Sequence, residues 1–300
     1  MSDELFLTEL MNKIHFPQEA QEVYLALYQQ ILHNPEHNDS MTSAVQLFMD
    51  TSSEKAFEEI DKLSAELNEH SYTMSMLLLL LCAKPLMEKY IEKGLPEDIY
   101  WDSLKDLGYK LKECYHIHGI WGTFVRGWFP GFYQMSRFAL GRMQYEYATF
   151  SFETVTINGI TIKSGDKVLM IHIPSSGSFT KEERLESYHM AKEFYSKDFN
   201  NQPIPVVCDS WLLYPAYKEV FPTHSNIRSF IDDFSYIYEK TEEEFHDAWR
   251  IFGNDYNKSA KDWPQTTSLQ KAFAEYFING GKPGIGYGIF ILYCFNMKKI

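Results

Sequence analysis

The sequence predicts an α+β protein, in which a helical N-terminal region precedes a mixed β-sheet flanked by helices. Apolar residues recur at helical spacing in about the first 120 positions, whereas later ones alternate or form short β-branched runs. The charge changes too. Residues 1–110 hold 8 Lys and no Arg against 20 Asp and Glu, while residues 111–300 are almost neutral. We therefore expect two domains, 1–120 and 121–300, with the joint within 119–140.

The composition excludes several classes of protein. A net charge of −13 argues against a nucleic-acid binder, which needs a basic surface. The four Cys residues show no CxxC spacing, so neither a disulfide scaffold nor a zinc ribbon is expected. The N-terminus lacks the pattern of a signal peptide, and the longest apolar run is far shorter than the ~20 residues that span a bilayer. We expect a cytoplasmic protein that binds no membrane.

The first half is expected to be a helical bundle. Helices are predicted from Pro17 through Ile31, over 54–67, over 72–84 and over 99–118. Ser52 and Ser53 offer caps for the second of these, Pro85 is expected to end the third, and Gly119 the fourth. The apolar run 77–81 fits a membrane or partner helix as well as a bundle core, and its length favours the core.

The second half alternates strands and helices. Asn158-Gly159 lies between two β-branched triplets, which predicts a hairpin over 155–162, because both turn residues tolerate a positive φ. Further strands are expected over 142–150, 167–173, 204–208, 229–238 and 284–293. Helices are expected from Thr180 to about Asp198, near 214–221, and after Thr266 or Thr267, the last ending at Gly280-Gly281.

The connection after strand 167–173 is a candidate anion site. Small residues precede a capped helix, whose N–H groups and dipole attract a phosphate. The candidate cofactor-binding residues are Ile173, Ser175, Ser176, Gly177, Ser178, Phe179 and Thr180. The alternative is an ordinary strand-to-helix connection capped by Thr180, and Glu182 and Glu183 in the first turn would compete with an anion.

Three titratable residues are candidates for proton transfer. Glu146 shares a strand face with Arg142 and Gln144, and the alternative is a solvated polar face. His172 is the titratable group of an otherwise apolar strand, and the alternative is a hydrogen-bonded core histidine. Asp209 ends the next strand, where it or Ser210 could instead cap a helix. The groups could face one cavity if the two strands are neighbours.

Other motifs give weaker signals. Cys114, His116 and His118 resemble a metal cluster, but positions i and i+2 of a helix point to different faces, and we expect no metal. Cys208 would need an adjacent base to act as a nucleophile, and a buried strand cysteine is the simpler interpretation. The glycine-rich 281–288 precedes a strand, so it does not fit a phosphate loop.

Five short motifs resemble a bacterial acyltransferase family that joins a helical N-acyltransferase N-terminal domain to a GNAT-like C-terminal domain. They are Leu140 to Glu146, Ile171 to Pro174, Cys208 to Pro215, Ser225 to Ile227, and Thr267 to Gln270. The resemblance implies a GNAT-type sheet, with an acyl-coenzyme A between two splayed strands. It also implies acyl transfer, expected to be of acetyl, to an amine of a small molecule or peptide. Glu146, His172 and Asp209 would then serve as base or proton relay.

The acidic first half would shape the acceptor pocket and favour a cationic acceptor. GNAT loops usually carry an Arg or Gln and two small residues around the pyrophosphate, whereas 175–180 has one Gly and no Arg. An alternative is therefore a catalytically silent GNAT-like protein that binds a metabolite or partner. A purely helical interaction protein is disfavoured by the predicted hairpin.

Overall fold

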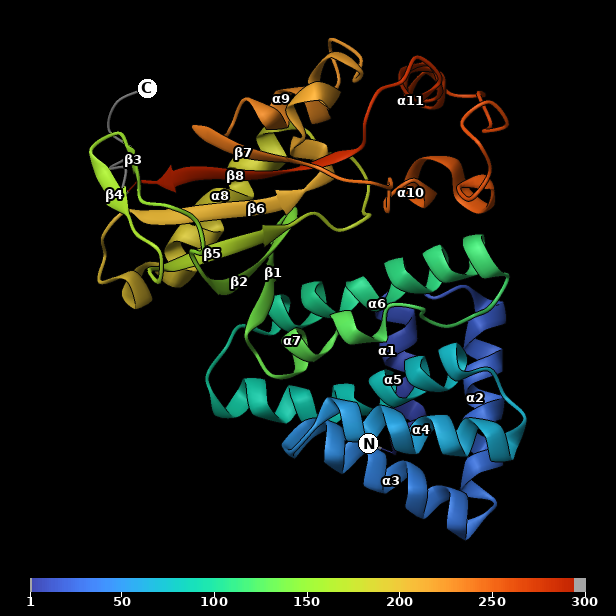
Figure 1. Ribbon diagram of the computed structural model, residues 1–300. Coiled ribbons are helices and arrows are strands. Elements are labelled where there is room, and N and C mark those ends of the chain that lie inside the picture. Colours follow the sequence, from blue (N-terminus) through green and yellow to red (C-terminus); the bar gives the residue numbers. More distant parts are fainter. Residues whose placement is uncertain (1, 294–300) are drawn as a thin grey trace. The chain divides into compact units, whose positions relative to one another are not determined.

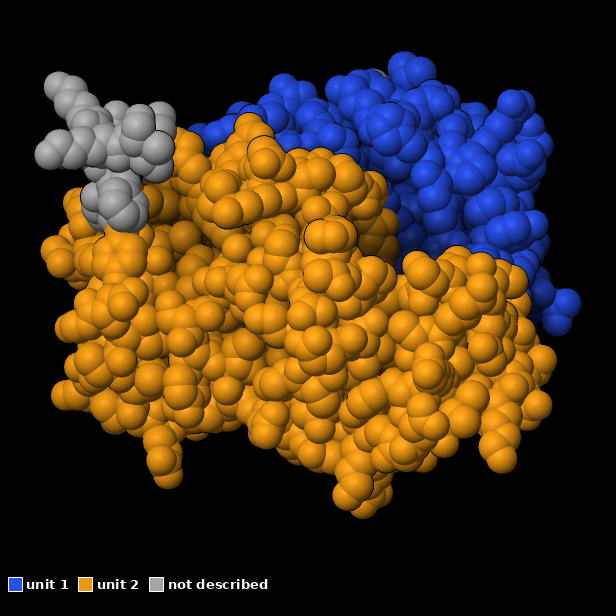
Figure 2. Space-filling model, turned by 90° about the horizontal axis from the view of Figure 1, so that it is seen from above, with its two compact units in different colours: residues 1–139 blue, residues 140–300 orange. Residues whose placement is uncertain are grey.

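The computed structural model describes residues 2–293 of the 300-residue chain. It divides into two compact units, residues 1–139 and 140–300, coloured blue and orange in Figure 2. The division falls within the aromatic stretch 119–140, where the sequence places the joint. The α+β fold class is confirmed, since helices fill the first unit and a mixed sheet with helices makes up the second (Figure 1).

The first unit is built from helices. They are α1 (Asp3–Lys13), α2 (Gln18–Leu32), α3 (Pro35–Asp50), α4 (Ser53–Leu67), α5 (Ser71–Glu92), α6 (Glu97–His118), η1 (Arg126–Trp128) and α7 (Pro130–Tyr133). The predicted caps are confirmed at two ends: Ser52 accepts from the Lys55 N–H, and Gly119 ends α6 with φ +68°. Within α5, Leu77 through Leu80 are fully buried, which confirms the bundle-core interpretation. No helix among residues 2–293 is long and apolar enough to cross a membrane.

The predicted end of the third helix is wrong. Helix α5 runs through Pro85 and ends at Glu92. An interior proline costs a helix roughly 3 kcal/mol. Beyond it, however, Leu86 and Tyr90 are almost fully buried, and each such side chain contributes about 1.5–3 kcal/mol. Tertiary packing therefore offsets the cost of the proline, and the local signal at Pro85 could not show that.

The six-stranded sheet has the order β1-β2-β5-β6-β8-β7. Its strands are β1 (Arg137–Leu140), β2 (Met143–Thr149), β5 (Lys167–His172), β6 (Ile204–Ser210), β7 (Tyr236–Thr241) and β8 (Gly284–Leu292). Strands β5 and β6 are parallel, whereas β2–β5, β6–β8 and β7–β8 are antiparallel. The sheet is therefore mixed, as the sequence predicts.

A separate hairpin, β3 (Val155–Ile157) and β4 (Ile160–Ile162), confirms the Asn-Gly prediction. Asn158 and Gly159 have φ values of 49° and 83°, as a two-residue turn requires. Ile157 and Ile162 are buried in one apolar cluster with Val207 of the sheet. The hairpin thus packs on one face of the sheet.

The helices of the second unit follow the strands. They are α8 (Lys181–Tyr195), η2 (Ser196–Phe199), η3 (Trp211–Leu213), η4 (Pro215–Glu219), α9 (Asn226–Ile231), α10 (Trp249–Phe252), η5 (Gly253–Asp255) and α11 (Ser268–Ile278). Thr180 and Thr267 both form complete capping boxes. The strand predicted over 229–238 is wrong in its first half. Ser225 caps a helix there by accepting from the Arg228 N–H, and β7 begins only at Tyr236.

Helix α8 covers the face of the sheet opposite the hairpin. The Tyr195 hydroxyl donates to the Tyr145 carbonyl, and the Tyr145 hydroxyl lies 2.9 Å from that of Ser187. The rings of Tyr188 and Phe290 are 4.8 Å apart. Side chains alternate along a strand, so β5 presents Leu169 and Ile171 to this helix and Met170 and His172 to the other face.

Candidate active site

Glu146 and His172 form a hydrogen-bonded pair on strands β2 and β5. Gln144 lies opposite His172 in the register, and Glu146 is opposite Met170, so Glu146 and His172 are diagonal neighbours on one face. His172 Nε2 lies 2.6 Å from Glu146 Oε1. The two side chains are only 22 % and 23 % exposed, which shields the pair partly from water. The structure thus brings together two of the three predicted catalytic residues.

Strand β6 adds Asp209 beside this pair. The β5–β6 ladder pairs Leu169 with Val206 and Met170 with Val207. Both strands continue beyond these pairs, β5 to His172 and β6 to Ser210. This is the pattern expected where neighbouring parallel strands separate. By strand alternation, Asp209 lies on the same face as Val207, Met170 and His172. Ser210, not Asp209, caps η3, because its side chain accepts from the Leu212 N–H.

The electrostatic environment of Asp209 connects it to its neighbours. Burial raises the pKa of the Asp209 carboxyl, and the charge of Glu242 raises it further, whereas Lys240 and His172 lower it. Tyr287 lies opposite Asp209 on β8, and its pKa is raised by burial and then by that carboxylate. Four ionisable groups, Glu242, Lys240, His172 and Tyr287, therefore interact with the Asp209 carboxyl.

Sequence reasoning missed Lys240, Glu242 and Tyr287. Lys240 Nζ lies 3.4 Å from Glu242 Oε1, and the Glu242 N–H donates to the Pro283 carbonyl. The charged run from Glu239 to Glu244 was the available signal, but only the pairing of β7 with β8 places it near Asp209.

The candidate cofactor loop leads from β5 to α8. Ile173 directly follows β5, and Thr180 caps α8. Between them lie Ser175, Ser176, Gly177, Ser178 and Phe179. Gly177 has φ +45°, and a Cβ placed on it would meet no atom within 4 Å, so its backbone is open to close approach. The loop therefore has the backbone accessibility that a phosphate site needs.

The helix start is partly satisfied by its own glutamate. Glu183 accepts from the Thr180 N–H at 2.8 Å and from the Ser178 hydroxyl at 2.7 Å. The Ser178 hydrogen bond, followed by that of the Thr180 N–H, lowers the pKa of Glu183. The competition for the helix dipole expected from the sequence is thus realised by Glu183.

Two arginines from outside the loop hold its carbonyl groups. Arg142 donates through Nε to the Ser178 carbonyl at 2.6 Å and through Nη1 to the Pro174 carbonyl at 3.1 Å. Arg184 donates to the Phe179 carbonyl at 3.3 Å. The loop itself contains no arginine, but the β1–β2 turn supplies one from 36 residues away.

The nucleophile and metal-ligand candidates of the sequence do not contribute to this site. Cys208 is buried on the face opposite Asp209, and burial raises the pKa of its thiol, so it is not activated as a nucleophile. Among residues 2–293, no three His, Cys, Asp or Glu side chains are arranged to hold a metal ion.

Comparison with known proteins gives two family matches and several structural ones. The model of the GNAT-like C-terminal domain matches residues 138–290, and that of the N-acyltransferase N-terminal domain matches residues 6–135. No curated protein matches. The crystal structure of an acyltransferase in complex with decanoyl-CoA and teicoplanin is 18 % identical, with a TM-score of 0.71 over 95 % of this chain and 87 % of that one.

Two further structures share the fold. A mutant acyltransferase, orf11*, in complex with octanoyl-CoA is 17 % identical, with a TM-score of 0.72 over 95 % of this chain and 87 % of that one. An acyltransferase in complex with decanoyl-CoA is 16 % identical, with a TM-score of 0.63 over 95 % and 99 % of the two chains. The resemblance stated from the motifs is confirmed, and the chain belongs to the N-acyltransferase family that joins an N-acyltransferase N-terminal domain to a GNAT-like C-terminal domain.

Proposed function

We propose that the chain transfers a medium-length acyl group from acyl-coenzyme A to an amine, with His172 as the base and Glu146 holding it. The observation that carries this proposal is the 2.6 Å contact between Glu146 Oε1 and His172 Nε2. It lies at the end of β5, directly before the loop proposed to bind the coenzyme. A base within reach of the attacking amine and a phosphate site one loop away are what direct transfer requires.

The pair orients the imidazole for proton transfer. The Glu146 carboxylate accepts a hydrogen bond from the Nε2–H group of His172, which favours the tautomer in which Nδ1 is the basic nitrogen. The neutral amine attacks the thioester carbonyl, a C–N bond forms, and the C–S bond breaks. The amine proton passes to His172 and then to the departing thiolate, and the Glu146 carboxylate stabilises the transient imidazolium.

The acceptor is proposed to arrive as a cation. The Asp209 carboxylate interacts electrostatically with both His172 and Glu242, and its charge favours an ammonium group over an anion. The acidic first 110 residues would attract the same acceptors at long range. Asp209 would hold the ammonium group, which loses one proton to solvent before attack, and His172 would then take the second proton from the attacking neutral amine. Acceptors of this class include amino groups of small molecules and peptides, and one related acyltransferase was solved with the glycopeptide teicoplanin.

Arg142 is proposed to prepare the coenzyme loop. The C=O and N–H groups of a peptide unit point in opposite directions. Because Arg142 binds the carbonyls of Pro174 and Ser178, the N–H groups of Ser175 and Phe179 point away from it. They lie on either side of Gly177 in the sequence, whose backbone is open to close approach. This arrangement suits a pyrophosphate and provides the positive charge that the loop itself lacks.

The acyl group is proposed to be longer than the acetyl expected from the sequence. The structures that share this fold contain octanoyl- and decanoyl-coenzyme A. A series of acyl-coenzyme A thioesters from acetyl to decanoyl, assayed by thiol release with a panel of amines, tests this. We expect the highest kcat/KM at eight to ten carbons. Binding of the thioesters without turnover would contradict the proposed transfer, and no binding of any of them would favour the catalytically silent GNAT-like protein that binds a metabolite or partner.

A further inference from the structure

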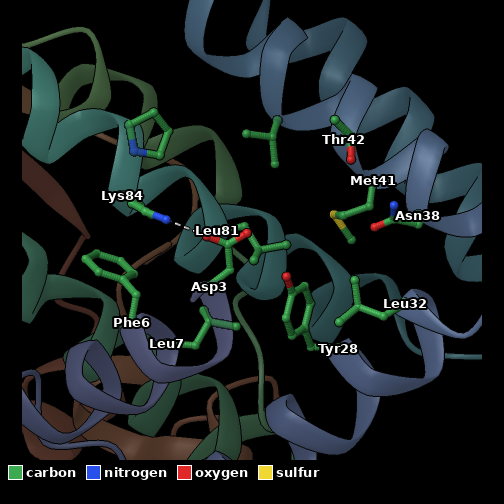
Figure 3. A pocket seen from close by; sticks show the side chains of 12 residues that line it. Asp3, Phe6, Leu7, Tyr28, Leu32, Asn38, Met41, Thr42, Leu81 and Lys84 are labelled. Carbon is green, nitrogen blue, oxygen red and sulfur yellow. Dashed lines mark hydrogen bonds and ion pairs between the residues drawn. The ribbon is translucent and has the colours of Figure 1, made fainter. Parts of the chain in front are cut away.

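The first unit contains a pocket that is lined by none of the proposed catalytic or coenzyme-binding residues. It has a volume of about 410 Å³ and opens among helices α1, α2, α3 and α5 (Figure 3). Ligand pockets in proteins typically measure ~300–1,000 Å³, so this one suits a small molecule. Leu7, Met41 and Leu81 provide apolar walls from three of the helices. The pocket is thus large enough to hold the apolar part of a small molecule.

An ion pair lies in the wall of this pocket. Lys84 Nζ is 2.7 Å from Asp3 Oδ1, and the two side chains are 37 % and 54 % exposed. Figure 3 shows the Tyr28 hydroxyl pointing into the space beside this pair, with Asn38 and Thr42 of α3 on the facing side. Burial, and then the neighbouring Asp3, raise the pKa of Tyr28, so its hydroxyl stays protonated as a donor.

We propose that this pocket binds a zwitterion with an apolar body, of which an α-amino acid with an apolar side chain is the simplest form. The ligand carboxylate pairs with Lys84, and the ligand ammonium pairs with Asp3. The side chain fills the space against Leu7 and Met41. On binding, the ion pair between Lys84 and Asp3 is replaced by two ion pairs with the ligand, so each of the four charges has a partner.

Charge balance disfavours the other ligand classes. An anion with an apolar tail would gain Lys84 but would face the Asp3 carboxylate, which the same binding would desolvate. A cation would gain Asp3 and meet the same difficulty at Lys84. A neutral apolar molecule would gain nothing from the pair. The zwitterion alone satisfies both charges in one half-buried site.

The experiment uses the full chain with carbon-13 in its methionine methyl groups. Met41 lines the pocket, and its signal among the twelve methionines is assigned with Met41→Leu. L-Phenylalanine at millimolar concentration should shift the Met41 signal in a saturable way. N-acetyl-L-phenylalanine and L-phenylalaninamide carry one charge each, and we expect both to bind about tenfold more weakly.

Variants of Lys84 and Asp3 test whether these two side chains bind the charged groups of the ligand. Lys84→Met and Asp3→Asn should each weaken L-phenylalanine binding by about tenfold or more. The control is Lys62→Met, which breaks an ion pair of the same 2.7 Å length on α4, away from the pocket, and should change nothing. Thermal unfolding of each variant verifies that it is folded. The proposal is overturned if Met41 does not respond, if the singly charged analogues bind equally well, or if both pocket variants retain the wild-type affinity.

Discussion

Glu146 and His172 are separated by 26 residues along the chain, yet their side chains meet at 2.6 Å across two antiparallel strands. The register that pairs Gln144 with His172 creates this contact. A shift of one residue in either strand would turn one of the side chains to the opposite face, toward helix α8. The proposed catalytic pair thus depends directly on the ladder between β2 and β5.

Removing the imidazole should abolish most turnover without affecting the coenzyme. We expect His172→Ala to lower kcat by about 10²-fold or more, because positioned acid–base catalysis typically contributes 10²–10⁴-fold. Glu146→Gln keeps an oxygen acceptor but loses the charge, so a smaller loss of roughly tenfold is expected. Steady-state kinetics give kcat, and calorimetry gives the Kd of acyl-coenzyme A, which should change less than about twofold. Full activity in both variants would contradict the assignment.

Arg142 should contribute to the affinity for the phosphates of the coenzyme and not to the affinity for its acyl end. Arg142→Gln removes the donors to the Pro174 and Ser178 carbonyls, and we expect the Kd of acyl-coenzyme A to rise roughly tenfold. Arg142→Lys keeps the charge but not the two-pronged geometry and should recover only part of the affinity. An acyl-pantetheine, which lacks the pyrophosphate, should bind all three forms equally.

The control for this series is Arg250→Gln, which removes another arginine from an ion pair, Nε to Asp247 Oδ1 at 2.7 Å, on the short helix α10. It should leave the affinity for acyl-coenzyme A unchanged. An equal loss for acyl-pantetheine in Arg142→Gln would show that the arginine supports the fold of the loop and does not prepare a phosphate site.

Local chemistry explains which parts of the fold could be predicted. The hairpin depends on Asn158 and Gly159, whose tolerance of positive φ is a property of those residues alone. The continuation of α5 through Pro85 depends instead on where Leu86 and Tyr90 are buried, which no local pattern records. The short helix α9, capped by Ser225, occupies the start of the strand predicted over 229–238, and β7 begins only at Tyr236.

The candidate site shows the same limit. Glu146, His172 and Asp209 could each be selected by residue type and strand position, and their catalytic roles stay predictions. The partners of these groups come from distant segments: Glu242 and Lys240 reach Asp209 only because β7 joins the edge of the sheet beside β8. Arg142 reaches the loop across 36 residues. Sequence spacing carries no information about such contacts.

The ionised Asp209 carboxyl should lower the free energy of unfolding at neutral pH. Burial and Glu242 raise the pKa of its carboxyl, so the ionised form is less favourable in the folded chain than in the unfolded one. The penalty is absent below the ordinary Asp pKa of ~3.9 and develops as the pH rises through the raised value. Because Asp209 is exposed and solvent screens its charge, Asp209→Asn should raise Tm at pH 7 by only about 1 °C or less, and the gain should vanish near pH 4.

The same variant should lose activity toward cationic acceptors. Scanning calorimetry at several pH values checks the stability, and kcat/KM for a cationic and a neutral amine checks the acceptor role. We expect the cationic amine to lose more. A lower Tm at pH 7, or an equal loss for both amines, would contradict the stated environment or the stated role of Asp209.

Arg184 should be the most costly of these residues to replace. Its side chain is fully buried and donates through Nε to Asp233 at 2.8 Å, with further bonds to Ser229 and to the Phe179 carbonyl. Arg184→Met leaves the Asp233 carboxylate without this partner, and we expect the free energy of unfolding to fall by about 3–5 kcal/mol. Urea unfolding measures the change, and the exposed Arg250→Met should cost less than about 1 kcal/mol. Adding Asp233→Asn to Arg184→Met should recover part of the loss, because the unpaired charge is then removed. If the double variant is no more stable than the single one, the loss comes from packing around α8 and not from the stranded carboxylate.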